Sequence, residues 1–342
     1  MKNFFDPDSI LIFGASKKKK KSGNHVLRNI LNYTDKKVYL IHPKHTKIYD
    51  LKCYRTINQL PVKKIDLAII ILPVKYVLDT LLECFDIKIN TIIIESGSLY
   101  VKGEEESEKL EKLAKIRKKL NESSTRILGP NSIGFYCANR HKNDLITSLI
   151  YFDTLPGLKA KNLSIISQTG LTLSGILQGQ NYIQEFGIAK IAAIGNKFDV
   201  NECDVLELLE DDPDTDVIGL YLEDIKQGKR FRELCSKIAP QKPIILLKSG
   251  KTAKGKEAII SHTKSLAGNY KIIEALSKQI GIITVDDFKE LLDVAKILLS
   301  QPIPKGNRIG VISISGAGTV LSCDLAERYG LILPSLSEQQ YD

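Results

Sequence analysis

Short apolar runs alternate with amphipathic stretches along most of this 342-residue chain, and this alternation constrains its fold more than any other feature. The apolar runs are rich in Ile, Leu and Val with little polar alternation, which is typical of strands covered on both faces. In the first half, strands are expected at 10–13, 37–41, 66–72, 91–95 and 126–128, and helices near 24–33, 75–86 and 104–120. The pattern predicts a parallel, doubly wound α/β sheet.

A second alternating series follows a polar stretch, 137–160, which contains Pro156-Gly157 and which we interpret as a linker. Strands are expected at 162–166, 188–194, 216–222, 243–248 and 281–284, and helices at 169–180, 202–210, 227–238, 269–279 and 286–299. After another linker, a strand at 308–314 and a helix near 319–329 indicate an incomplete third α/β domain, because one βα unit cannot bury both faces of a strand. The expected domains are 1–136, 161–300 and, with its linker, 301–342.

The formal net charge is +9, so nucleic-acid binding has to be considered. The only dense basic block is Lys17–Lys21, however, and the chain has no Trp and no interleaving of aromatic with basic residues. Nucleic-acid binding depends on an extended set of cations that neutralise phosphates. We therefore expect no nucleic-acid partner, and the lysine block indicates either an anionic small ligand or a solvated surface loop.

Membrane and secreted classes of protein fit the sequence poorly. No apolar run reaches the roughly 20 residues that span a bilayer, and the N-terminal residues lack the long apolar core of a signal peptide. The cysteines are scattered without Cys-x-x-Cys spacing, so buried free thiols are expected rather than disulfides or a metal site. The sequence predicts a cytoplasmic protein with no membrane partner.

A glycine turn, Gly14-Ala15-Ser16, follows the first expected strand, and the next helix begins near Gly23. Backbone N–H groups at a helix N-terminus bind anions, a glycine lets a phosphate approach, and the Ser16 hydroxyl adds a donor. The spacing differs from that of the dinucleotide motif Gly-x-Gly-x-x-Gly, and the five lysines Lys17–Lys21 fill the gap before Gly23 instead. Since any doubly wound fold needs a tight turn here, this loop alone leaves the ligand open.

Prolines and lysines follow the next two strands, as Pro43-Lys44 and as Pro73 with Lys75. Ligands of open parallel sheets bind at the carboxyl ends of the strands, where these residues and Gly14 would meet. Prolines shape a groove without presenting N–H groups, and lysines supply positive charge. Together these motifs predict a phosphate-bearing nucleotide ligand.

The motifs resemble the CoA-binding domain of the NDP-forming acyl-CoA synthetases, the superfamily that includes succinyl-CoA synthetase. In the first domain the resemblance lies in Gly14-Ala-Ser16, Pro43-Lys44, Pro73-Val-Lys75 and Leu128-Gly-Pro-Asn-Ser-Ile-Gly134. In the second it lies in Ile166-Ser-Gln-Thr-Gly170, Ile194-Gly-Asn-Lys-Phe-Asp199, Tyr221-Leu-Glu-Asp224, Leu247-Lys-Ser-Gly250 and Ser261-His-Thr263. Their order is most similar to the α-subunit of ADP-forming acetate–CoA ligase. This implies a Rossmann-like CoA-binding domain, which includes Asn131 in its CoA site, followed by a flavodoxin-like domain.

The resemblance implies a reaction in which acyl-CoA, phosphate and ADP give a carboxylic acid, CoA and ATP through an acyl phosphate and a phosphohistidine. His262 matches the phosphorylated histidine, and the small residues around it predict a loop that presents the side chain. A neutral imidazole is a good nucleophile near pH 7. Glu223 matches the glutamate that hydrogen-bonds this histidine and fixes its tautomer. The alternative for His262 is a surface or core histidine.

A further segment, Ser167-Gln168-Thr169-Gly170, follows a strand and opens a helix. The resemblance implies that its N–H groups and hydroxyls bind the transferred phosphate. An ordinary N-cap is the alternative. Departures from the family pattern are Lys264 and Asp224, each where Gly is usual, and Glu95-Ser-Gly97-Ser98, which replaces a more apolar turn.

The family binds ADP on an ATP-grasp domain, for which the chain has no corresponding segment. The resemblance therefore implies an ATP-grasp β-subunit or domain as partner, carrying ADP or ATP with Mg²⁺, in a hetero- or homo-oligomer. The expected substrate is a small carboxylic acid, with acetate first.

Two other functions compete with this interpretation. One is a non-catalytic CoA or acyl-CoA sensor, or the regulatory domain of a lysine acetyltransferase, although a sensor needs neither His262 nor Glu223. The other is an NAD-binding oxidoreductase, which predicts an acidic residue after the second strand, where His42-Pro43-Lys44 stands instead.

Overall fold

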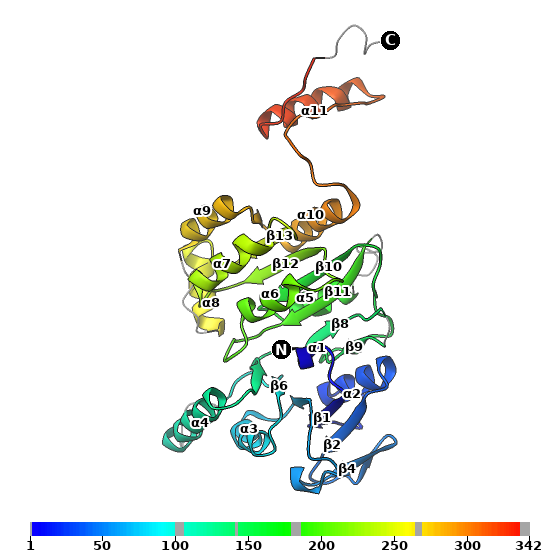
Figure 1. The fold of residues 1–342 in the computed structure, drawn as a ribbon, viewed down its shortest axis with the longest axis vertical. Helices are drawn as coiled ribbons and strands as arrows, with labels where there is room; N and C mark the ends of the chain where they lie inside the picture. Colours follow the sequence, from blue (N-terminus) through cyan, green and yellow to red (C-terminus); the bar gives the residue numbers. More distant parts are fainter. Residues whose placement is uncertain (1, 100–105, 141–142, 179–185, 264–268, 336–342) are drawn as a thin grey trace. The chain divides into compact units, whose positions relative to one another are not determined.

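The computed structural model describes residues 2–99, 106–140, 143–178, 186–263 and 269–335. The chain divides into two compact units, Met1–Ser300 and Gln301–Asp342, and the first contains two sheets of seven strands each (Figure 1). Within the described stretches, no helix is both long and apolar enough to cross a membrane. Cys53, Cys84, Cys137, Cys203 and Cys235 are buried free thiols, and Cys323 is half-buried.

The first sheet has the strand order β3-β4-β2-β1-β5-β6-β7. Its strands are β1 (Ser9–Phe13), β2 (Lys37–Ile41), β3 (Lys47–Ile48), β4 (Leu51–Tyr54), β5 (Leu67–Ile70), β6 (Thr91–Ile94) and β7 (Arg126–Leu128). All pair in parallel except the short β3, which pairs antiparallel with β4. The parallel strands, counted along the chain, therefore lie in the order 3-2-1-4-5-6 of Rossmann folds. This confirms the predicted Rossmann-like sheet.

Helices cover both faces of this sheet because successive residues of each strand point to opposite sides. Ile10 and Ile12 of β1 belong to the same apolar core as α2 (Ser22–Tyr33). Leu11 and Phe13 pack instead with α3 (Val77–Asp86) and α4 (Glu106–Asn121). The remaining helical segments of this part are α1 (Lys2–Phe5) and the short 3₁₀ helices Ile57–Gln59 and Val74–Tyr76.

The second sheet has the order β14-β13-β12-β10-β11-β8-β9. Its strands are β8 (Phe135–Cys137), β9 (Leu145–Ile146), β10 (Asn162–Ser167), β11 (Gly187–Ala193), β12 (Val217–Leu222), β13 (Ile244–Lys248) and β14 (Ile283–Val285). The strands β10 to β14 are parallel, and in chain order they lie 2-1-3-4-5, the order of flavodoxin-like folds. The predicted flavodoxin-like domain is thus confirmed.

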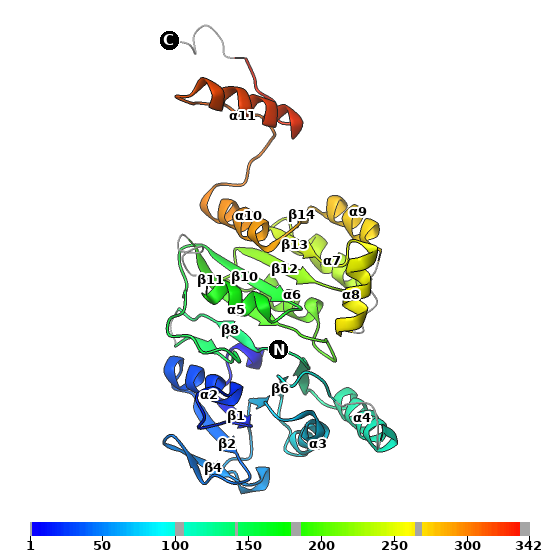
Figure 2. The same ribbon diagram turned by 180° about the vertical axis from the view of Figure 1, so that it is seen from behind.

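The helices described beside this sheet are α5 (Leu171–Gln178), α6 (Glu202–Glu210), α7 (Gly228–Ile238), α8 (Ala253–Thr263), α9 (Tyr270–Ile280) and α10 (Phe288–Ser300). One face packs against α6 and α7, and the other against α5 and α10. Figure 2 shows the same arrangement from behind.

The stretch 137–160, predicted as a linker, carries part of the second sheet. Tyr136 pairs with Ile191 of β11 and with Ile146 of β9, both antiparallel. The sequence did not indicate these strands because each is short and polar residues separate them. Tyr136 is nevertheless fully buried. The segment is therefore a hairpin that covers the edge of the sheet and not an exposed linker.

The two sheets share an apolar core and direct polar contacts. The Phe5 ring, from α1, lies 5.2 Å from that of Phe135 in β8, edge to face. Asn29 of α2 is fully buried and donates to Ser148 O at 3.0 Å and to Ile150 O at 2.7 Å. These contacts hold the two sheets of the first unit together.

The second unit contains α11 (Gly316–Arg328), whose N-cap residue Ser315 accepts the Gly318 N–H at 3.2 Å. The strand predicted at 308–314 is not formed, and only a single bridge joins Arg308 to Ile332. Ile312 and Ile314 are fully exposed. A strand needs a neighbour to pair with, and the described residues of this unit supply no strand beside 308–314.

Candidate functional site

A cleft of about 1020 Å³ opens at the carboxyl edge of the first sheet. It lies where β1 pairs with β2 on one side and β5 on the other, the switch point at which ligands of open α/β sheets bind. Several residues that the sequence predicts as CoA-binding come together in its lining: Gly14, Ala15, Ser16, Gly23, Pro43 and Pro73.

The glycines of this lining are required by the backbone itself. Gly14 has φ +90°, and a Cβ there would lie 2.1 Å from Ile71 O. A Cβ on Gly23 would lie 2.0 Å from Gly14 O. The turn after β1 therefore packs against β5 and the start of α2 so closely that only glycine fits. This packing places the first residues of α2, with their free N–H groups, in the lining of the cleft.

Most charged side chains that line the cleft are cationic. The cations are Lys17, Lys18, Lys21 and Arg55, and the one acid in the lining is Glu83. Burial raises the pKa of Glu83, and the nearby carboxylates of Asp79 and Asp86 raise it further. The negative charge of this acid is therefore disfavoured, which adds to the cationic character of the lining. Such a lining favours an anion that carries several charges.

His42 also lines the cleft, as a fixed neutral donor. Its Nδ1 accepts the N–H groups of Lys44 at 3.1 Å and of His45 at 2.9 Å, so the ring proton sits on Nε2. Burial lowers the pKa of His42, and the positive charges of His45, Lys17 and Lys44 lower it further. The rings of His42 and His45 lie 4.4 Å apart.

Sequence reasoning did not identify Arg55, His42 or His45 as site residues. Arg55 directly follows β4, whose hairpin with β3 returns the chain to the carboxyl edge of the sheet. The signal available was the alternation of apolar and polar residues in Leu51-Lys-Cys-Tyr54.

The structure places three other predicted CoA-binding residues outside the lining of the cleft. Lys44 is exposed on the turn after β2. Lys75 is exposed, with its ammonium 4.8 Å from the centroid of the Tyr76 ring, and Tyr76 does line the cleft. Asn131 has φ +60°, and its Nδ2 lies 3.4 Å from Asn196 Oδ1, beside the second sheet. Their contact with CoA stays a prediction.

The second group of predicted residues lies in the turn between β10 and α5. Ser167 is buried, and its Oγ lies 2.8 Å from Thr169 O and 2.7 Å from Thr172 Oγ1. It also accepts the N–H of Thr169 at 3.2 Å. A Cβ on Gly170 would lie 2.5 Å from Ile133 Cγ2. The Ser167 hydroxyl therefore holds the turn together, and contact of this segment with phosphate stays a prediction.

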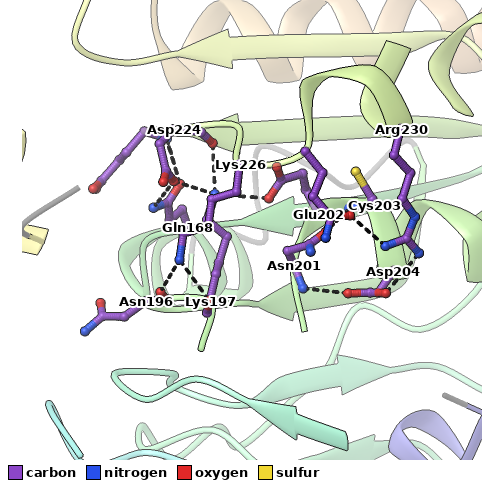
Figure 3. A network of polar contacts seen from close by, with 12 residues as sticks. Gln168, Asn196, Lys197, Asn201, Glu202, Cys203, Asp204, Asp224, Lys226 and Arg230 are labelled. Atoms are coloured by element: carbon purple, nitrogen blue, oxygen red, sulfur yellow. Dashed lines mark hydrogen bonds and ion pairs between the residues drawn. The ribbon is translucent and has the colours of Figure 1, made fainter. Parts of the chain in front are cut away.

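Gln168 has a different environment from the one that phosphate binding requires. Its Oε1 accepts the N–H of Glu223 at 2.9 Å and that of Asp224 at 3.2 Å. Its Nε2 donates to Asp224 Oδ1 at 2.8 Å, as Figure 3 shows, and its own N–H donates to Tyr221 O at 3.0 Å. The side chain is buried and joins the end of β10 to the loop after β12.

Asp224, where the family pattern has Gly, belongs to a buried ion network. Its carboxylate pairs with the ammonium of Lys197, whose side chain is fully buried. Lys197 Nζ also lies 3.0 Å from Glu202 Oε2 and donates to Asp224 O at 2.9 Å (Figure 3). The network therefore ties the loop after β12 to the loop after β11.

Glu223 is buried at the carboxyl end of β12, and its Oε2 has no hydrogen-bond partner among the described residues. Beside it, Lys248 at the end of β13 donates from Nζ to Glu223 O at 2.7 Å and to Ser249 O at 2.6 Å. Burial lowers the pKa of Lys248 to about 8, although the carboxylates of Asp224 and Glu223 oppose the shift. Sequence reasoning did not single out this lysine.

His262 lies in the last turn of α8, so its backbone is helical and not in the loop that the small residues predicted. The helix begins after Thr252, whose Oγ1 accepts the Gly255 N–H at 3.1 Å as an N-cap. An ion pair between Lys254 and Glu257 supports its first turns. The side chain of His262 and the whole of Lys264 lie outside the described residues, so their positions relative to Glu223 stay predictions.

Glu95, in the turn that departs from the family pattern, is buried at the carboxyl edge of the first sheet. Neither of its carboxylate oxygens has a partner in the described part of the chain. Burial raises the pKa of this carboxyl well above its usual range. Burial without a partner therefore favours the protonated form of Glu95 over its carboxylate.

Two family models match the chain. A CoA binding domain matches residues 8–138, and a succinyl-CoA ligase like flavodoxin domain matches residues 160–298. Among curated proteins, the acetate–CoA ligase [ADP-forming] II subunit alpha of Pyrococcus furiosus is 36% identical over 98% of this chain and 70% of its own length.

Acetate–CoA ligase [ADP-forming] II of Archaeoglobus fulgidus is 36% identical over 100% of this chain and 49% of its own length, so the chain spans about half of that relative. Among solved structures, the dinucleotide forming acetyl-coenzyme A synthetase 1 of Ca. Korarchaeum cryptofilum, in complex with phosphate and ADP, is 32% identical with a TM-score of 0.84. That match covers 98% of this chain and 70% of the solved chain.

Proposed function

Because the chain belongs to the family of ADP-forming acetate–CoA ligases, we propose that it is the α-type chain of such an acid–thiol ligase. In the proposed reaction, acyl-CoA, phosphate and ADP give a carboxylic acid, CoA and ATP. Acetate is the proposed acid, in keeping with the names of the relatives.

CoA is proposed to bind in the cleft of the first sheet. Its diphosphate and 3′-phosphate match the cationic lining, and the N–H groups at the start of α2 are donors for a phosphate oxygen. Ser16 Oγ accepts the Lys18 N–H at 3.1 Å, which leaves its hydroxyl proton available to the ligand.

The proposed chemistry proceeds in three balanced steps. A phosphate oxygen attacks the thioester carbonyl, the C–S bond breaks, and CoA leaves as a thiolate that takes up a proton. A nitrogen of the His262 imidazole then attacks the phosphorus of the acyl phosphate, and the carboxylate leaves with the bridging oxygen. Finally an oxygen of the ADP β-phosphate displaces the imidazole and takes the phosphoryl group.

The observation that carries the catalytic proposal is the Oε2 atom of Glu223, which is buried and has no hydrogen-bond partner among the described residues. A buried carboxylate oxygen without a partner is costly unless another group completes it in the working protein. The proposed partner is the His262 N–H, which would fix the tautomer and stabilise the positive charge that develops on the ring. The N–H groups at the start of α5 are proposed to hold the phosphate.

The last phosphoryl transfer is proposed to need an ATP-grasp β-subunit or domain that binds ADP with Mg²⁺. Among the residues that the structure describes, no group of three or more His, Cys, Asp or Glu side chains is arranged to hold a metal ion. In this proposal the partner holds Mg²⁺ together with the nucleotide, as the family resemblance implies, in a hetero- or homo-oligomer in the cytoplasm.

Phosphorylation of the chain tests the proposal directly. The full chain is incubated with acetyl-CoA and labelled phosphate, or with labelled acetyl phosphate, with and without a complementary ATP-grasp chain. We expect an acid-labile, base-stable label that is absent from His262→Ala. Failure of the wild type to label under every condition favours a CoA sensor, and label that persists in His262→Ala removes the histidine from the mechanism.

A further inference from the structure

The peptide of Glu223 is held from both sides. Its N–H donates to Gln168 Oε1 at 2.9 Å, and its carbonyl accepts from Lys248 Nζ at 2.7 Å. Both partners are buried side chains, at the ends of the two strands that flank β12. A charge-assisted bond on one side and an amide bond on the other leave this residue little freedom to shift.

Gln168 is itself fixed by the ion network. Its Nε2 donates to Asp224 Oδ1 at 2.8 Å, and the same carboxylate pairs with the buried ammonium of Lys197. Lys197 is anchored in turn on Glu202 Oε2 at 3.0 Å (Figure 3). A side chain locked in this way is pre-organised to orient another residue, because turning its amide breaks several bonds at once.

The carboxylate and the backbone of Glu223 differ in their hydrogen bonding. The backbone is fully bonded, whereas Oε2 is buried without a partner in the described residues. A group that is held rigidly but left unpaired is arranged for a ligand or a side chain that joins it during function.

We propose that Gln168 and Lys248 are positioning residues that clamp the Glu223 peptide, so that its carboxylate meets the imidazole which accepts the phosphoryl group. This inference rests on the proposed function, since it assumes that Glu223 orients His262. It gives Gln168 a different task from the phosphate contact that the family resemblance implies. Both residues act through Glu223 and touch neither CoA nor phosphate.

The clamp predicts an effect on one step only. A displacement of about 1 Å in a catalytic constellation lowers its rate on the order of 100-fold. Loss of either clamp residue should therefore slow phosphorylation of the chain by about 10- to 100-fold. The affinity for CoA should not change, because the cleft is built from the first sheet.

The test compares Gln168→Met with a matched control, Asn162→Leu. Asn162 is a buried amide at the opposite end of the same strand, β10, where its Oδ1 accepts the Lys159 N–H at 2.7 Å and its Nδ2 donates to Lys159 O at 3.1 Å. Both variants replace a buried amide by an apolar side chain of similar size. Lys248→Met supplies an independent second variant. Labelling rate, CoA affinity and thermal stability are measured on the full chain.

We expect similar losses of stability in Gln168→Met and Asn162→Leu, slow labelling only in Gln168→Met and Lys248→Met, and unchanged CoA affinity in all. Wild-type labelling rates in both Gln168→Met and Lys248→Met would overturn the clamp and leave the proposed function standing. An equal fall in labelling in Asn162→Leu would reduce the effect to stability and also overturn it. No label on the wild type would refute the proposed function and the clamp together.

Discussion

Arg126, in the last strand of the first sheet, lies with its Nε 2.9 Å from Oδ2 of Asp199, in the loop that follows β11 of the second sheet. Asp199 also accepts the N–H of Ile127 at 2.8 Å. Arg126 Nη2 lies 3.1 Å from Asp204 Oδ2. These charge-assisted contacts, between the half-buried Arg126 and Asp199 and the buried Asp204, join the two sheets beside the loops of the candidate site.

Removing the Asp199 charge is expected to destabilise the first unit. Asp199→Asn should lower the free energy of unfolding by about 2 kcal/mol, since hydrogen bonds to charged groups each contribute on the order of 1.5–3 kcal/mol. Urea unfolding measures the change. In the control, Glu274→Gln breaks the exposed pair with Lys278, at 3.2 Å, and should cost about 0.5 kcal/mol or less. If the two substitutions lowered the free energy of unfolding equally, the Arg126–Asp199 pair would contribute no more to stability than an exposed ion pair.

Arg55 is expected to bind a phosphate of CoA, because it is the arginine in the lining of a cleft that otherwise carries lysines. Arg55→Gln should weaken CoA binding by about tenfold, the equivalent of about 1.4 kcal/mol, and should reduce the dependence of the affinity on salt. Isothermal titration with CoA at two salt concentrations measures both. Lys64→Gln, an exposed lysine before β5 and away from the lining, is the control and should bind like the wild type. Unchanged affinity in Arg55→Gln would remove Arg55 from the site.

The strand–helix alternation was enough to predict both sheets, because a run such as Leu67–Ile70 is buried on both faces and reads as continuously apolar. It did not predict β8, since Phe135–Cys137 is short and its burial depends on the neighbouring β11. The helix at Ala253–Thr263 was missed for a related reason: its small residues suggested a loop, whereas the Thr252 cap and its helix-forming residues decide the outcome.

The candidate site shows where sequence motifs stop being informative. Gly14 and Gly23 were predicted as ligand residues and do line the cleft, yet their close backbone contacts explain them without a ligand. Gln168 was assigned to phosphate by its place in a motif, and only the three-dimensional contacts reveal its bonds to Glu223 and Asp224. A motif specifies which residues are near an edge; it does not specify which atoms remain free there.

His42 should make stability depend on pH below neutrality. Its folded pKa is lowered by burial and by the charges of His45, Lys17 and Lys44, so the unfolded chain binds the proton more readily. The stabilising effect is therefore complete above the ordinary histidine pKa of about 6.5 and is lost as the pH falls through the folded pKa.

The variant His42→Asn tests this, because its side-chain oxygen can accept the same two backbone N–H groups and cannot be protonated. Urea unfolding at pH 7.5 and pH 5.5 should show a smaller loss of stability in the variant than in the wild type. An identical loss of stability in both proteins would mean that the His42 ring does not contribute to the pH dependence of unfolding.

Glu95 should produce the opposite pH dependence. Its folded pKa is raised by burial, so the folded chain holds the proton more tightly than the unfolded chain. Its favourable effect is therefore complete below the ordinary glutamate pKa of about 4.3 and is lost as the pH rises toward the folded pKa. Relative to Glu95→Gln, which stays neutral, the wild type should lose up to about 1.4 kcal/mol of unfolding free energy per pH unit in that window. Paired urea titrations between pH 5 and pH 8 measure the difference, and a constant difference across the range would show that Glu95 titrates as an ordinary carboxylate.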